Sequence, residues 1–363
     1  MNYASEAAVF ETPNLEEGVA LIEKVVEQAR LRRSSDFISR VVLLASPHFA
    51  SLIESLAHTC ISKTNCLNIW GGCVSGLLHG GKVYGQKPAL MVAVFGEAFE
   101  PAKQKGAGSK TISLCLAETD HLVMEQLRAG LGNEPGSDCS QADTLGLLSY
   151  GANYLSMPRL EFGRLCHQPH STASLSVSQP LTLNSEGLEF FTEVKTVTES
   201  NGLFLLKVDG VSAALALGCP EEQTKPIGLR LQVIDKDRES WIPVLSLHAD
   251  GTMCLVAPVA KGQQIRLARR TPNAVHEEFK AWQPLIATHF GGRPPAMGLL
   301  IAGFERSEMC HDIDDDVAQI LKSFPDTDII GIFGQANWLG LQEKVLAPPR
   351  NNRLSLCLFN PNS

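Results

Sequence analysis

The segment RVVLLASPHF, residues 40–49, decides the fold, because its pattern opens a unit that the chain repeats near its other end. Its apolar, β-branched run predicts a strand that is covered on both faces. SLIESLAHTCIS (51–62) then returns to helical spacing, CLNIWGGCVSGLLHGG (66–81) gives a strand and a glycine-bearing turn, and PALMVAVFG (88–96) gives a further strand. This order is typical of an α/β unit.

The second copy of the unit has the same order at similar spacing. MGLLIAGFERSE (297–308) is followed by DIDDDVAQILKSF (312–324), TDIIGIFGQANWLG (327–340) and RLSLCLFN (353–360). We therefore predict an α/β (α+β) fold of two pseudo-repeated mixed-sheet lobes with helices packed on the sheets. The seam between two such lobes is a natural place for a ligand.

Composition limits the class of protein. With 363 residues, 44% of them apolar and 19% charged, the chain is long enough for two globular domains. A net charge of −8 argues against nucleic acid as a partner. Neither a signal sequence nor an apolar run of the ~20 residues that cross a bilayer is present. The ten cysteines include no CxxC pair, which is typical of reduced thiols in the cytoplasm.

The segments outside the two copies predict further elements. Residues 14–32 read as a helix with Asn14 as its N-cap, and residues 121–131 as a short helix before a loop at 132–142. Short β-type runs separated by turns fill residues 174–268, and a helix follows at 272–286. An interruption at 218–222 suggests a division into domains of residues 1–218 and 219–363.

The order of elements and several local signatures resemble the FIST family (F-box and intracellular signal transduction proteins), over roughly residues 41–359. The matching segments are NIWGGCVSG (68–76), ESNGLFLLKVDGVSAALALG (199–218), LLIAGFERSE (299–308) and IIGIFGQANWLG (329–340). The chain departs from the family pattern at three places. Ser212 stands where proline is usual, Gly303 where cysteine is usual, and Ala336–Asn337 where a Gly-Glu pair is usual.

The resemblance implies a FIST-N-like domain, a FIST-C-like domain and a sensory role. FIST domains are regarded as small-ligand sensors in bacterial signalling, and some members bind haem and report nitric oxide. We therefore expect a small-molecule ligand, a separate signalling partner protein and no catalysis. A haem-binding gas sensor is an alternative, and a plain scaffold is another.

Polar residues and glycines at the strand ends are the candidate ligand-binding residues. Glycines let backbone N–H groups approach a ligand, a guanidinium binds carboxylate or phosphate, and asparagine and tryptophan supply hydrogen bonds and a flat apolar wall. Each also has a structural explanation: a tight turn, an ion pair, or a tryptophan packed in the core. The candidates are Gly72, Cys73, Ser75, Arg306, Gln335, Asn337 and Trp338.

Cys166, His167 and His170, in LCHQPHS, are the candidate metal or haem ligands, since thiolate and imidazole lie close in sequence. An exposed loop with solvated histidines is the alternative. A cysteine-dependent enzyme would use Cys73 with His48 or His79 as its base. The P-loop, GxGxxG, GxSxG and HExxH motifs of common enzyme classes are absent.

Overall fold

The computed structural model describes residues 3–32, 37–84, 87–96, 109–117, 143–148, 157–167, 170–219, 229–234, 239–303, 313–334, 336–340 and 354–360. The described residues divide into two compact units: unit 1 holds those up to Ser185 and from Trp282 onward, and unit 2 those from Glu186 to Ala281. The helix predicted at 121–131 and the loop at 132–142 lie outside the described residues.

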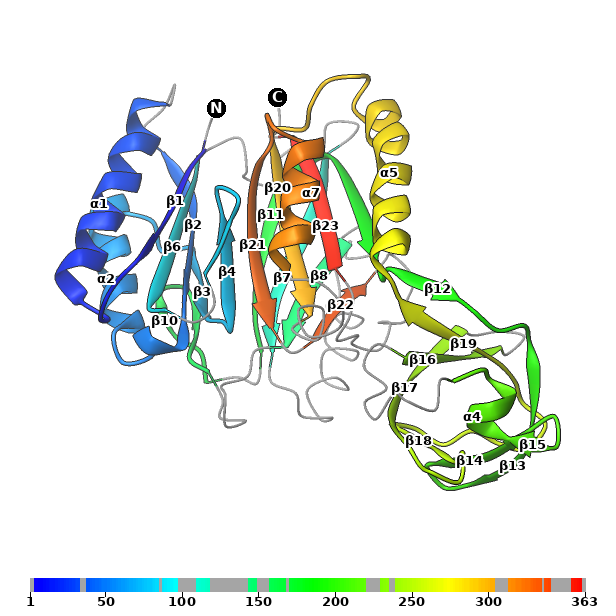
Figure 1. The fold of residues 1–363 in the computed structure, drawn as a ribbon. Coiled ribbons are helices and arrows are strands. Elements are labelled where there is room, and N and C mark those ends of the chain that lie inside the picture. Colours follow the sequence, from blue (N-terminus) through cyan, green and yellow to red (C-terminus); the bar gives the residue numbers. More distant parts are fainter. Residues whose placement is uncertain are drawn as a thin grey trace, which may run out of the picture. The chain divides into compact units, whose positions relative to one another are not determined.

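Unit 1 contains both copies of the repeated unit, and the parallel strand pair of each copy lies in its own sheet (Figure 1). The first sheet has the strand order β1-β6-β2-β3-β9-β10. Its strands are β1 (Tyr3–Val9), β2 (Ile38–Ala45), β3 (Ile69–Cys73), β6 (Ala89–Gly96), β9 (Arg159–Glu161) and β10 (Arg164–Leu165).

The second sheet has the order β22-β8-β7-β11-β23-β20-β21-β4-β5. Its strands are β4 (Gly76–His79), β5 (Lys82–Tyr84), β7 (Ser109–Ala117), β8 (Asp143–Leu148), β11 (His170–Ser185), β20 (Met297–Gly303), β21 (Asp328–Gly334), β22 (Ala336–Gly340) and β23 (Leu354–Asn360).

The two sheets repeat one topology, which confirms the duplication. In the first, β6 runs antiparallel to β2, and β2 runs parallel to β3. In the second, β23 runs antiparallel to β20, and β20 runs parallel to β21. The match continues outward, since β1 corresponds to β11 and the hairpin β9–β10 to the hairpin β4–β5. Six consecutive positions of each sheet therefore agree in order and direction.

The helices of unit 1 repeat as well. They are α1 (Leu15–Leu31), α2 (Ile53–Thr64), the part of α5 (Pro272–His289) from Trp282 onward, and α7 (Ile313–Ser323), with a short 3-10 helix, η1 (Pro47–Phe49), before α2. The helix α2 connects the parallel pair β2/β3, and α7 connects β20/β21. The predicted cap of α1 is confirmed, because Asn14 Oδ1 accepts a hydrogen bond of 2.8 Å from the Glu16 N–H.

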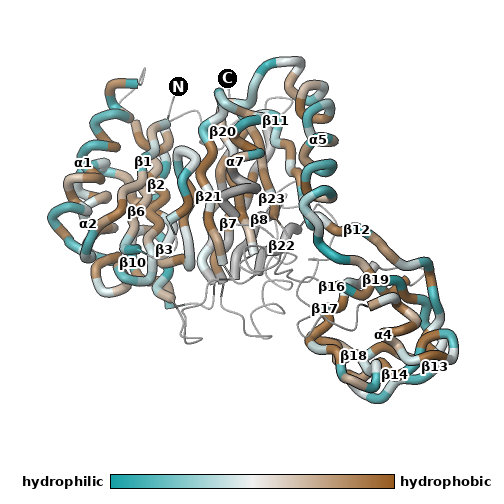
Figure 2. Tube along the Cα trace, viewed as in Figure 1, coloured by the Kyte–Doolittle hydropathy of each residue, from teal (hydrophilic) through white to brown (hydrophobic). Residues whose placement is uncertain are grey.

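The layers of unit 1 follow from the alternation of side chains along its strands. Val42 and Leu44 of β2 pack into an apolar core shared with the second sheet, while Val41 and Leu43 pack beneath α1 and α2. The predicted strand that is covered on both faces is thereby confirmed. Figure 1 shows α7 on the outer face of the second sheet. Figure 2 shows the strands of both sheets largely apolar, with polar residues on the exposed sides of the helices.

Unit 2 holds a closed antiparallel β-barrel, which is inserted into the second copy between β11 and α5, and it also includes α5 up to Ala281. Its order is β12-β19-β13-β14-β18-β17-β16, and the pairing of β16 with β19 closes it. Its elements are β12 (Leu188–Phe190), β13 (Lys195–Asn201), β14 (Phe204–Val208), β15 (Val211–Ser212), α4 (Ala213–Ala216), β16 (Leu229–Ile234), β17 (Glu239–Leu247), β18 (Met253–Leu255) and β19 (Gln264–Arg270).

The expected domain boundary near residue 218 falls inside this barrel. Strands on both sides of it pair with one another: β14 pairs with β18, and β13 pairs with β19. The compact units therefore do not coincide with residues 1–218 and 219–363. The interruption at 218–222 separates strands within unit 2 instead.

Candidate functional site

One end of unit 1 gathers the carboxyl ends of the parallel strands of both copies. In the first copy, Ala45 at the end of β2 pairs with Cys73 at the end of β3. In the second, Gly303 at the end of β20 pairs with Gly334 at the end of β21. The chain leaves β3 and enters β4 at Gly76, which pairs with Phe333 of β21, so the four strand ends meet.

We call this region the carboxyl-end site and define it by the segment Gly71–Ser75, Arg159, Gly303 and Gly334. In α/β sheets, ligands bind in the crevice outside the carboxyl ends of parallel strands. The pairing of β4 with the other copy's sheet thus places two such ends beside each other.

Gly71 and Gly72 lie within β3 and not in a turn, so the predicted glycine-bearing turn is wrong at these positions. Their φ values of 148° and 141° favour glycine. A Cβ on Gly71 would lie 1.9 Å from the Leu43 carbonyl oxygen, and one on Gly72 would lie 2.4 Å from the Pro158 carbonyl oxygen. The glycines are required because β2 and the chain entering β9 approach β3 so closely.

Cys73 is fully buried in the core between the first sheet and its helices. Burial raises the pKa of its thiol to about 12, which suppresses the thiolate that a nucleophile needs. The two candidate bases engage serine hydroxyls: His48 Nδ1 lies 3.2 Å from Ser46 Oγ, and His79 Nε2 lies 3.0 Å from Ser5 Oγ. This environment argues against a cysteine-dependent enzyme centred on Cys73.

Brief alkylation of the native protein at pH 7.5 is expected to leave Cys73 unmodified while half-buried Cys166 reacts. The raised pKa lowers the thiolate fraction of Cys73 about a thousandfold relative to an ordinary thiol, and burial blocks the reagent as well. Peptide mapping by mass spectrometry after iodoacetamide treatment measures both sites, and labelling in urea provides the control. Equal rates at Cys73 and Cys166 in the native state would contradict this account.

The other predicted ligand-binding residues are only partly placed. Ser75 is half-buried and immediately precedes β4, at the carboxyl-end site. Asn337 and Trp338 lie in β22, where their backbones pair with Leu147 and Gly146 of β8. Arg306 and Gln335 lie outside the described residues.

The candidate metal ligands lie directly after β10 and at the start of β11. Cys166 Sγ contacts Glu161 Oε2 at 3.7 Å, and His167 is exposed. His170 begins β11 opposite Ala117, and its side chain lies outside the described residues. Among the side chains that the structure describes, no group of three or more histidine, cysteine, aspartate or glutamate residues could hold a metal ion.

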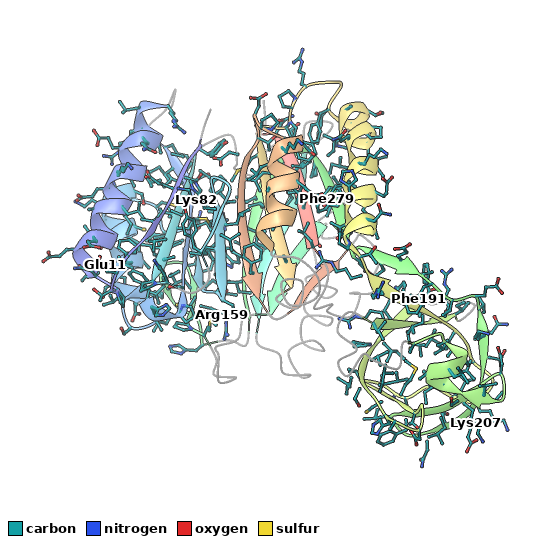
Figure 3. All side chains as sticks on the ribbon, in the orientation of Figure 1. Glu11, Lys82, Arg159, Phe191, Lys207 and Phe279 are labelled. Carbon is teal, nitrogen blue, oxygen red and sulfur yellow. The ribbon has the colours of Figure 1, made fainter. Side chains whose placement is uncertain are left out.

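Arg159 was missed by the sequence analysis. It is 3% exposed and pairs through its backbone with Gly72. Figure 3 labels it at the end of unit 1 where the carboxyl-end site lies. Nothing in the local sequence marks it, because only the pairing of β9 with β3 brings it there. It adds a guanidinium to a site whose neighbouring residues are small.

A second polar group, also missed, lies at the opposite ends of the strands and links the two sheets. We call it the amino-end cluster: Tyr3, Ser5, His79 and Asp328. Ser5 Oγ donates to Asp328 Oδ2 at 3.0 Å, and the Tyr3 hydroxyl donates to the Ala296 carbonyl oxygen at 3.2 Å. Burial, and then the nearby Asp328 carboxylate, raise the pKa of Tyr3 above its ordinary value.

Neither a family model nor a curated protein matches the chain. In the part of the chain that the structure describes, the helices lack the length and apolar character needed to span a bilayer.

Proposed function

We propose that the chain is a non-enzymatic sensory protein of the FIST type, which binds a small ligand at the carboxyl-end site and passes the bound state to a partner protein. The observation that carries the proposal is the pairing of β4 with β21, which gathers strand ends of both copies. A ligand held there contacts both copies. If it binds one arrangement of the copies more tightly, it shifts the population toward that arrangement, and a partner protein reads the shift.

Arg159 supports a ligand that carries a negative group. A guanidinium binds a carboxylate or phosphate through two parallel hydrogen bonds, and the effect is stronger where water is excluded. Arg159 is 3% exposed, and it lies opposite Gly72 at the carboxyl-end site. We assign it the role of anchoring that group.

The absence of catalysis in this proposal rests on Cys73, whose burial and raised pKa oppose nucleophilic chemistry. A cytoplasmic location is also part of the proposal. The ten cysteines of the sequence include no CxxC pair, which is typical of reduced thiols in such a compartment.

Native mass spectrometry of the protein, before and after incubation with a low-molecular-mass cell extract, tests the proposal. We expect a stoichiometric adduct of a small molecule on the wild-type chain. Arg159→Met and Arg159→Lys should lose most of that adduct, because methionine carries no charge and lysine cannot reproduce the two-point geometry. Arg164→Met is the matched control, since Arg164 is exposed on the neighbouring strand β10.

Urea unfolding of each variant shows whether it is folded. If Arg159→Met does not fold, Arg159→Lys still provides the test. A wild-type spectrum without any adduct under both conditions would overturn the proposal. An adduct that survives in both Arg159 variants would remove Arg159 from the site.

A further inference from the structure

We propose that unit 1 holds a second, internal site between its two sheets, which takes one small, uncharged, apolar guest. The facing surfaces of the sheets form one apolar core. Within it lies a cavity of about 20 Å³, bounded by Val42, Leu44 and Trp70 of the first sheet and by Leu299, Ile330 and Ile332 of the second. Both copies thus contribute to its wall.

The wall of the cavity is formed by carbon atoms, and this decides the chemistry of the guest. A buried water needs two to four polar partners, which such a wall does not supply, and apolar cavities of this kind stay dry. The volume exceeds the ~10–15 Å³ that one water-sized molecule requires. An apolar guest regains the dispersion contacts that the empty space forfeits, so the cavity favours such molecules over water or ions.

Trp70 contributes apolar atoms to the cavity wall and also carries a buried polar group. Its side chain is 2% exposed, and its Nε1 has no hydrogen-bond partner among the described residues. An orphaned buried N–H costs about 1–3 kcal/mol, so its presence in a core calls for an explanation. Phenylalanine would fill the same part of the core without that cost.

The position of Trp70 connects this cavity to the carboxyl-end site. Trp70 directly precedes Gly71 in β3, so its backbone is continuous with that site. A guest that occupies the cavity contacts side chains of both copies and stabilises the arrangement in which the sheets are packed as described. The internal site is distinct from the carboxyl-end site, and it stands whether or not an anionic ligand binds there.

Xenon is the probe for the test, because it is apolar, monatomic and small. Crystals of the full chain under xenon pressure should show one atom between the sheets. In solution, the indole N–H resonance of Trp70, assigned with Trp70→Phe, should shift on xenon addition. Val42→Ile should weaken xenon binding at least tenfold, because the added methyl group enters the cavity. Val41→Ile is the matched control, since Val41 faces the helices and not the cavity.

Leu299→Ala is the complementary variant, because it enlarges the cavity and should admit benzene as well as xenon. This arm keeps the test decisive if Val42→Ile destabilises the protein. Three outcomes would overturn the proposal: no xenon between the sheets of the wild-type protein, equal xenon binding by Val42→Ile and Val41→Ile, or ordered water in the cavity. None of them bears on native mass spectrometry of the Arg159 variants, so the two proposals fail separately.

Discussion

Gly71→Ala is expected to lower the free energy of unfolding of unit 1 by roughly 4 kcal/mol or more, enough to threaten folding of a typical domain. The new Cβ would lie 1.9 Å from the carbonyl oxygen of Leu43 and 2.7 Å from its carbonyl carbon. These are backbone atoms of the paired strand β2, so no side-chain rotation relieves the overlap. The φ of 148° adds strain for any residue with a Cβ. Urea unfolding followed by circular dichroism measures the loss.

Gly80→Ala is the matched control in the same unit. Gly80 lies in the turn between β4 and β5 with a φ of 54°, and a Cβ there would meet nothing within 4 Å. Only the cost of the left-handed backbone remains, about 1 kcal/mol. If Gly71→Ala proved no more destabilising than Gly80→Ala, this result would contradict the close approach of the β2 backbone to Gly71 in β3.

The fold was predictable from the sequence as far as its local patterns reach. The apolar runs at β2 and β20, each followed by helical spacing, predicted both strand–helix–strand units and the duplication, and in the structure the two strands of each unit pair in parallel. The partner of the hairpin β4–β5 was not predictable. Its residues lie within the first copy, between β3 and β6, yet they pair with β21 of the second. Local sequence encodes the turn of a hairpin but not the distant strand that it joins.

The glycines of β3 show a second limit. Adjacent glycines usually weaken a strand, so Gly71 and Gly72 were expected in a turn. What holds them in a strand is the approach of the Leu43 and Pro158 backbones, a tertiary feature. For the same reason, only part of the candidate site was predictable from the sequence. Ser75 is marked by its place after a strand, whereas Arg159 reaches the site only through the pairing of β9 with β3.

The amino-end cluster carries the second large effect: Asp328→Ala is expected to lower the free energy of unfolding of unit 1 by about 2 kcal/mol. The change removes the acceptor for the Ser5 hydroxyl, which is bound at 3.0 Å and joins β1 of the first sheet to β21 of the second. Asp326→Ala is the control, because Asp326 is exposed two residues earlier in the chain. An effect of Asp328→Ala no larger than that of Asp326→Ala would contradict the clamping role.

The same cluster predicts how stability changes at alkaline pH. The pKa of Tyr3 is raised in the folded protein by burial and then by the Asp328 carboxylate, whereas in the unfolded chain tyrosine ionises near pH 10. The unfolded state therefore releases the phenolic proton first, so the stability from neutral Tyr3 is complete below about pH 10 and decreases above it. Tyr3→Phe should lose less stability than the wild-type protein between about pH 10 and 11.5, measured by urea unfolding at each pH. Buried thiols titrate in both proteins and cancel in this comparison, so parallel losses would show that Tyr3 does not face Asp328 in a water-poor interface between the two copies.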